Sequence, residues 1–161
     1  MFTVTDTAGL SVEARYAALH EGLGHLVDGE PSLIANLANA SSLIFHTLPD
    51  LNWAGFYLFD GDELVLGPFQ GKPACIRIGI GRGVCGTAAA ERRTIVVPDV
   101  HEFPGHIACD AASRSEVVVP MVKDGSLIGV LDLDSPLPGR FTEEDGRGLE
   151  EVVEIILDQL P

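Results

Sequence analysis

Basic side chains are scarce in this sequence, and their scarcity narrows the range of partners. Lysine and arginine together number 10, against 24 aspartates and glutamates, so the formal net charge is −14. A surface with that charge repels the phosphates of nucleic acids and the headgroups of anionic lipids. We therefore expect neither nucleic acid nor a membrane among the partners.

Long apolar runs are also missing. No stretch approaches the roughly 20 residues that span a bilayer, and the N-terminal segment MFTVTDTAGL lacks the basic and apolar parts of a secretory signal. Cysteine numbers only three, an odd count that does not suit a disulfide-stapled secreted fold. Together these features favour a reducing compartment, and we expect a cytoplasmic protein.

Apolar residues are plentiful, and their spacing predicts the fold. They make up 46% of the 161 residues, enough for one domain, 1–161, with a substantial core. Apolar side chains recur at steps of three and four over about 11–48, which predicts two N-terminal helices. Over about 51–135 the period falls to two between Gly- and Asp-rich turns, which predicts a sheet of about six antiparallel strands. A C-terminal helix is expected over about 142–159.

The expected class is therefore α+β, with helices on one face of an antiparallel sheet and a pocket under long loops on the other. Within the sheet region, residues 68–74 are expected to form a loop, 75–80 a strand and 84–93 a helix. Thr142 is expected to cap the C-terminal helix, with Asp145 three residues further on in a capping-box position.

The three cysteines, Cys75, Cys85 and Cys109, are compatible with several roles. A lone cytosolic cysteine is most often a small buried apolar side chain. Structural zinc sites use short-spaced ligand pairs, and here no such pair exists; His101 and His106 could join Cys109, but their spacing matches no recognised zinc motif. The sequence therefore predicts no metal site.

Redox chemistry is the third alternative for the cysteines. It needs a thiolate nucleophile, a second thiol within reach and access for substrate. Cys109 lies in a polar, irregular segment of the kind that carries catalytic groups. Cys85 is expected at the start of a helix, where the helix dipole would favour its thiolate, and Cys75 lies at the junction of a loop and a strand.

Three acidic residues are expected at one end of the sheet. Asp132 and Asp134 are two residues apart on one strand and so project from the same face. Glu116 opens the strand expected to pair with it through a short turn. Such a cluster could face solvent, or it could attract an ammonium group and hold a proton in a pocket.

The stretches NWAGFYLFDGDELVLGPFQGKPACIRIGIGRGVCGTAA, VPDVHEFPGHIACDAASRSEVVVPM and LIGVLDLDSP resemble the GAF domain family. Within it, they resemble the free methionine-(R)-sulfoxide reductases. The resemblance rests on the three cysteines together with the D-x-H…C-D…S-E block and the L-D-x-D-S motif. It covers about residue 51 to the C-terminal helix and implies a GAF-like fold.

The resemblance also implies site residues. Cys109 would be the nucleophile and Cys75 the resolving cysteine, with Cys85 as an auxiliary or alternative resolving thiol. The substrate pocket would be lined by acidic and aromatic side chains, namely Glu116, Asp132, Asp134, Trp53 and Tyr57.

The activity implied is the reduction of free methionine-(R)-sulfoxide to methionine through a thiolate, a sulfenic acid and a disulfide. Such an oxidoreductase needs no bound metal or organic cofactor, and thioredoxin with NADPH would recycle it. The resemblance leaves a homodimer open. The alternative is a non-catalytic GAF module that binds a small molecule or senses redox state.

Overall fold

The computed structural model describes residues 1–161 and has the expected α+β architecture. Helices flank a single antiparallel sheet, as the periodicity predicts. The elements in chain order are α1 (Val12–Val27), α2 (Leu33–Thr47), β1 (Trp53–Phe59), β2 (Glu63–Gly71), β3 (Arg77–Gly79), α3 (Gly83–Glu91), β4 (Ile95–Val97), the 3-10 helix η1 (Val100–Glu102), β5 (Ser115–Lys123), β6 (Ser126–Ser135) and α4 (Glu143–Leu157).

The six strands have the order β3-β2-β1-β6-β5-β4, and every neighbouring pair is antiparallel. The β5–β6 hairpin closes on Asp124 and Gly125, whose φ angles are 51° and 78°. Two consecutive positive φ angles are typical of the tight turn that matches the twist of a hairpin. The turn, together with the irregularity between Met121 and Val122, sets the register that places Glu116 opposite Asp134.

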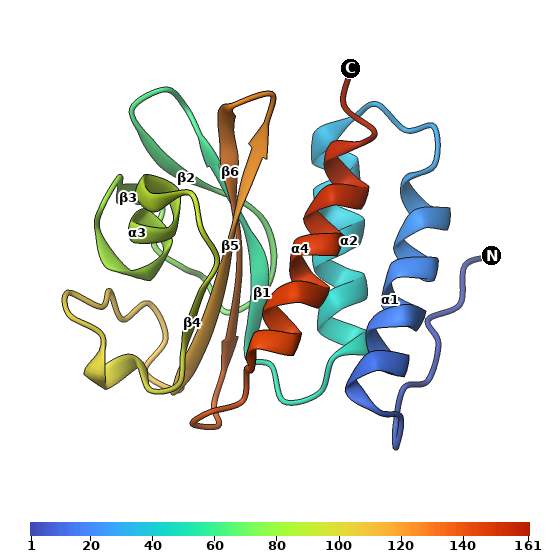
Figure 1. Ribbon diagram of the computed structural model, residues 1–161, viewed down its shortest axis with the longest axis horizontal. Coiled ribbons are helices and arrows are strands. Elements are labelled where there is room, and N and C mark those ends of the chain that lie inside the picture. Colours follow the sequence, from blue (N-terminus) through green and yellow to red (C-terminus); the bar gives the residue numbers. More distant parts are fainter.

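The helices form a layer on one side of the sheet. Figure 1 shows α1, α2 and α4 packed together on that side, with α3 and the long loop before β5 on the other. Each of the central strands β1, β5 and β6 contributes side chains to both faces of the sheet, because successive side chains of a strand point to opposite faces. Leu131 and Leu133 of β6 belong to the core under the three helices, whereas Val130 belongs to the smaller core on the α3 side.

The start of α4 is held as the sequence predicts. Thr142 Oγ1 accepts a hydrogen bond from the Asp145 N–H, and the Asp145 carboxylate accepts one from the Thr142 N–H at 2.9 Å. The same carboxylate accepts a 2.8 Å hydrogen bond from the Tyr16 hydroxyl of α1. One capping side chain therefore also ties the first helix to the last.

Several expected boundaries are wrong. The segment expected as a loop begins inside β2, which continues through Gly71, and the following strand is reduced to the three residues of β3. Pro68 is tolerated in β2 because it lies at the irregularity in the β1–β2 pairing and beyond the residues that pair with β3. Gly55 is required in β1, since a Cβ there would lie 2.3 Å from the Phe69 Cβ.

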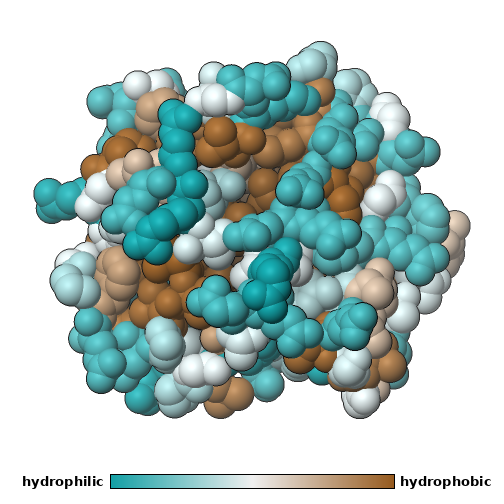
Figure 2. Space-filling view, in the orientation of Figure 1, coloured by the Kyte–Doolittle hydropathy of each residue, from teal (hydrophilic) through white to brown (hydrophobic).

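None of the helices combines the length and the apolar character that crossing a bilayer requires. The face shown in Figure 2 is mainly hydrophilic, and hydrophobic side chains show in patches between the polar ones. This pattern accords with the large excess of acidic residues in the sequence.

Candidate active site

A pocket lined by both apolar and polar side chains lies on the side of the sheet opposite α1, α2 and α4. Its walls are the ends of β1, β5 and β6, the N-terminal turn of α3, and the loops before β3 and β5. All but one of the predicted site residues line the pocket: Trp53, Tyr57, Cys85, Cys109, Glu116, Asp132 and Asp134. The exception is Cys75, whose neighbour in the chain, Ala74, is a lining residue.

Strand register brings the acidic residues together. Asp134 of β6 lies opposite Glu116 of β5 on one side and opposite Trp53 of β1 on the other. Asp132 precedes Asp134 by two residues on β6 and therefore projects from the same face of the sheet. The expectation that the three acids share one end of the sheet is confirmed, and they face the pocket.

Burial changes the acid–base chemistry of this cluster. Glu116 and Asp132 are 5% and 6% exposed. Loss of hydration, reinforced by the nearby Asp134, raises the pKa of Glu116 to about 8. Burial and the neighbouring acids also raise the pKa of Asp132 and of Asp134 well above the usual range. The cluster therefore holds protons near neutral pH and can donate one.

The cysteines divide into a bonded pair and a free thiol. Cys75 and Cys109 form a disulfide with their Cα atoms 5.8 Å apart, and it joins the segment before β3 to the loop before β5. Cys109 is exposed and Cys75 half-buried. Cys85 remains a free, buried thiol near the N-terminus of α3.

The expectation that the helix dipole keeps Cys85 as a thiolate is wrong. The side chain is 4% exposed and donates to Glu116 Oε1 at 3.9 Å. Burial, together with Asp132 and Glu116, raises the pKa of the Cys85 thiol well above its ordinary value. The dipole of one short helix does not offset the loss of hydration and the proximity of the acids.

Trp53 and Tyr57 fix the segment that carries Cys75. Trp53 Nε1 donates to the Lys72 carbonyl at 3.2 Å, and the Tyr57 hydroxyl donates to the Cys75 carbonyl at 3.0 Å. The two rings stack with centroids 5.9 Å apart. These aromatic side chains line the pocket and also position the backbone beside the disulfide.

Several lining residues were not predicted as site residues. His106 Nε2 lies 3.5 Å from Glu116 Oε2, and burial lowers the pKa of His106. Lys72 and Arg82 add basic side chains to a pocket whose carboxyl groups would otherwise dominate its charge. Asn52, just before β1, does not line the pocket, but its Nδ2 donates to two lining residues, Asp110 at 3.1 Å and Ser113 at 3.0 Å. It thereby ties the loop before β5 to β1. These residues lie in irregular segments, where periodicity carries no signal.

Comparison with known proteins identifies a matching family, a similar protein and similar solved structures. Residues 3–160 match the GAF domain. The chain is 57% identical over 138 residues to the free methionine-R-sulfoxide reductase of Escherichia coli (strain K12), covering 86% of this chain and 84% of that protein. The structure of fRMsr of Staphylococcus aureus in complex with substrate has a TM-score of 0.87 at 53% identity, covering 91% of this chain and 95% of that one. For free methionine-R-sulfoxide reductase from Neisseria meningitidis in complex with its substrate, the TM-score is 0.94 at 43% identity, with coverage of 99% and 95%.

Proposed function

This chain belongs to the GAF domain family, and from that premise we propose that it reduces free methionine-(R)-sulfoxide to methionine. The observation that carries the proposal is one pocket lined both by Cys109, which forms a disulfide with Cys75, and by a proton-retaining acid cluster. A pocket that only binds a ligand needs no redox-active cysteine pair beside an acid.

In the first step the Cys109 thiolate attacks the sulfoxide. The bond between the sulfoxide sulfur and its oxygen breaks, and a bond between the Cys109 sulfur and oxygen forms. The substrate sulfur gains two electrons, and Cys109 loses two as it becomes a sulfenic acid. The departing oxygen needs a proton, which the acid cluster of Glu116, Asp132 and Asp134 supplies because burial keeps it protonated. Methionine then leaves the pocket.

In the second step the Cys75 thiolate attacks the Cys109 sulfur. Water departs and the disulfide forms, in the pairing present in this structure. An external dithiol, thioredoxin, then reduces that disulfide, so that the thiols supply the electrons and no bound metal or organic cofactor is required. Exposed Cys109 offers the sulfur that thioredoxin attacks, and Ile76 and Ile107, 68% and 38% exposed, lie close to the disulfide in the chain. A reducing compartment such as the cytoplasm suits this cycle.

The wall chemistry suits a free amino acid. The acids can hold an α-ammonium group, and Lys72 and Arg82, with backbone N–H groups near α3, can hold an α-carboxylate. A methionine sulfoxide residue within a peptide carries neither charge there. Peptide would therefore leave buried polar groups unpaired, which strongly disfavours it.

A thioredoxin-coupled NADPH assay tests the proposal with free methionine-(R)-sulfoxide, its S-epimer and the N-acetylated R-epimer. Of the two free epimers, we expect turnover of the R-epimer alone. N-acetylation should lower kcat/KM by at least about a hundredfold. The Cys109→Ser variant should show no turnover, because a hydroxyl is a far weaker nucleophile. Free thiols are counted before and after the addition of sulfoxide to the reduced protein. Loss of two per chain supports the reductase, whereas binding without thiol loss would leave a non-catalytic GAF module.

A further inference from the structure

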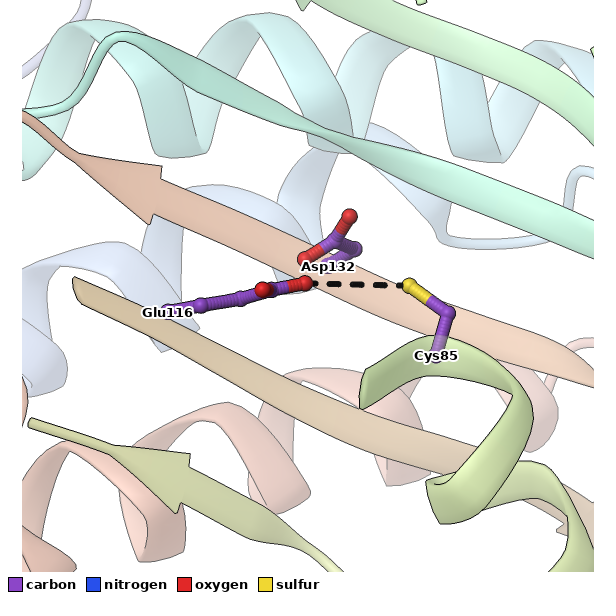
Figure 3. Close-up of side chains that lie close together, drawn as sticks. All are labelled: Cys85, Glu116 and Asp132. Carbon is purple, nitrogen blue, oxygen red and sulfur yellow. Dashed lines mark hydrogen bonds between the residues drawn. The ribbon is translucent and has the colours of Figure 1, made fainter. Parts of the chain in front are cut away.

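Three potential metal ligands meet at the base of the pocket from three different elements. Figure 3 shows Cys85 of α3, Glu116 of β5 and Asp132 of β6 pointing toward one another. One ligand atom from each residue lies within 4.8 Å of the other two. The side chains are 4%, 5% and 6% exposed, so the protein rather than solvent fixes their positions.

A second observation shows that this cluster is incomplete. Asp132 Oδ1 is buried and has no hydrogen-bond partner. An unsatisfied buried carboxyl oxygen is costly, and a positive group bound among the three side chains would remove that cost. His106 Nε2, 3.5 Å from Glu116 Oε2, places a nitrogen beside the cluster as a possible fourth ligand.

The donor set selects the class of cation. One sulfur with two carboxylates suits Zn²⁺ and similar borderline-soft ions, whereas Mg²⁺ and Ca²⁺ take six or more oxygens. In tetrahedral Zn²⁺ coordination, a thiolate sulfur and a carboxylate oxygen lie about 3.6 Å apart. Cys85 Sγ and Glu116 Oε1 lie 3.9 Å apart, so small side-chain movements would complete that geometry.

We propose that Cys85, Glu116 and Asp132 bind a Zn²⁺-like divalent cation that competes with the substrate. The cation and the α-ammonium group would use the same carboxylates, so they cannot bind together. The bonds to the metal form as the Cys85 thiol and the protonated carboxyl groups of Glu116 and Asp132 release their protons to solvent. Competition with the substrate rests on the proposed function, whereas metal binding does not.

The disulfide form of the protein gives a direct test, because Cys85 is its only free thiol. Titration with Co²⁺ should produce a saturable thiolate-to-metal charge-transfer band at one ion per chain, and Zn²⁺ should remove that band. Cys85→Ala should abolish the band, and both Cys85→Ala and Asp132→Asn should weaken Zn²⁺ binding in calorimetry at least about tenfold. The matched control is His101→Ala, which removes an exposed histidine 3.0 Å from Asp99 and should leave binding unchanged.

Competition is tested in the double variant Cys75→Ser/Cys109→Ser, in which Cys85 is again the only thiol and the sulfoxide cannot react. Free methionine-(R)-sulfoxide should displace Co²⁺ and bleach the band. The proposed metal site would be wrong if the disulfide form gave no charge-transfer band. It would also be wrong if both Cys85→Ala and Asp132→Asn left the affinity for Zn²⁺ unchanged. A band that persists at saturating sulfoxide, in a protein whose natural form turns sulfoxide over, would overturn the competition. If the natural form does not turn sulfoxide over but the band is present, the proposed function fails and the metal site stands.

Discussion

At the scale of single residues, the three cysteines differ because their surroundings differ. Cys109 is exposed on a loop, Cys75 is half-buried beside it, and Cys85 is enclosed by acids at the start of α3. Reactivity follows thiolate character and access. The proposed roles of Cys75 and Cys109 as the redox pair accord with this difference, and burial raises the pKa of the Cys85 thiol, which disfavours its thiolate.

This difference predicts distinct phenotypes for two serine variants. Cys75→Ser should reduce about one equivalent of sulfoxide per chain and then stop with thioredoxin, because no intramolecular disulfide can form. Cys85→Ser should continue through many turnovers. Rapid-quench measurement of methionine formed per enzyme, followed by the coupled assay, distinguishes the two. The reverse result would make Cys85 the resolving cysteine.

Glu116 should make stability depend on pH. Its pKa rises from 4.5 to about 8 on folding, so the folded state binds a proton that the unfolded state has released. The stabilisation is therefore complete below pH 4.5 and is lost as pH rises to about 8. Glu116→Gln keeps the shape of the side chain but cannot become charged. The variant should therefore be more stable than the unmutated protein at about pH 9, and this difference in the free energy of unfolding should be smaller at about pH 5.

Urea unfolding at the two pH values measures this difference. The control is Glu102→Gln, an exposed glutamate on the pocket side of the sheet. It should change stability by the same small amount at both values. Equal effects of the Glu116 and Glu102 substitutions would show that burial does not govern the protonation of Glu116.

At the scale of elements, the N-terminus of α4 depends on one hydroxyl. Thr142 caps the helix, and its partner Asp145 also accepts a hydrogen bond from Tyr16. Thr142→Ala should lower the free energy of unfolding by about 1 kcal/mol, with a range of roughly 0.5–2. Thr142→Ser should restore most of the loss in the same denaturation experiment. If alanine and serine behave alike, the cap does not stabilise the fold.

Elements were predictable where local chemistry determines them. The capping pair of α4, the helical periodicity of α1 and α2, and the turn at Asp124 and Gly125 all have short-range causes. The end of β2 was not predictable, because Pro68 and Gly71 are typical of loops. Pairing with β1 holds this segment in the sheet, and that pairing is a long-range contact with no sequence period of its own.

The site was predictable to a similar extent. Alternation on one strand put Asp132 and Asp134 on one face, and the hairpin brought Glu116 to them. The contact between His106 and Glu116, and the entry of Lys72 into the pocket wall, depend on how two irregular loops fold over the sheet. Burial was equally inaccessible from sequence, which is why the protonation state of Cys85 was predicted wrongly.

At the scale of the whole molecule, the sheet separates two hydrophobic cores. Leu149 lies fully buried among the helices, and Leu64 lies fully buried on the pocket side. Each leucine-to-alanine change should cost about 2–5 kcal/mol of unfolding free energy. Only Leu64→Ala should also lower kcat/KM, because its core includes the pocket residues Trp53, Tyr57 and Cys85. Denaturation and steady-state kinetics of both folded variants check this, and a comparable kinetic loss in Leu149→Ala would show that the two cores are not independent.

The alternation along β6 has a consequence for how this protein can evolve. Leu131 and Leu133 face the helices while Asp132 and Asp134 face the pocket, so one strand encodes both surfaces in alternate positions. A single inserted or deleted residue upstream in this strand would turn two carboxyl groups into the apolar core and two leucines into the pocket. We therefore expect lineages of this chain to vary β6 by substitution and to confine changes in length to the turns at its ends.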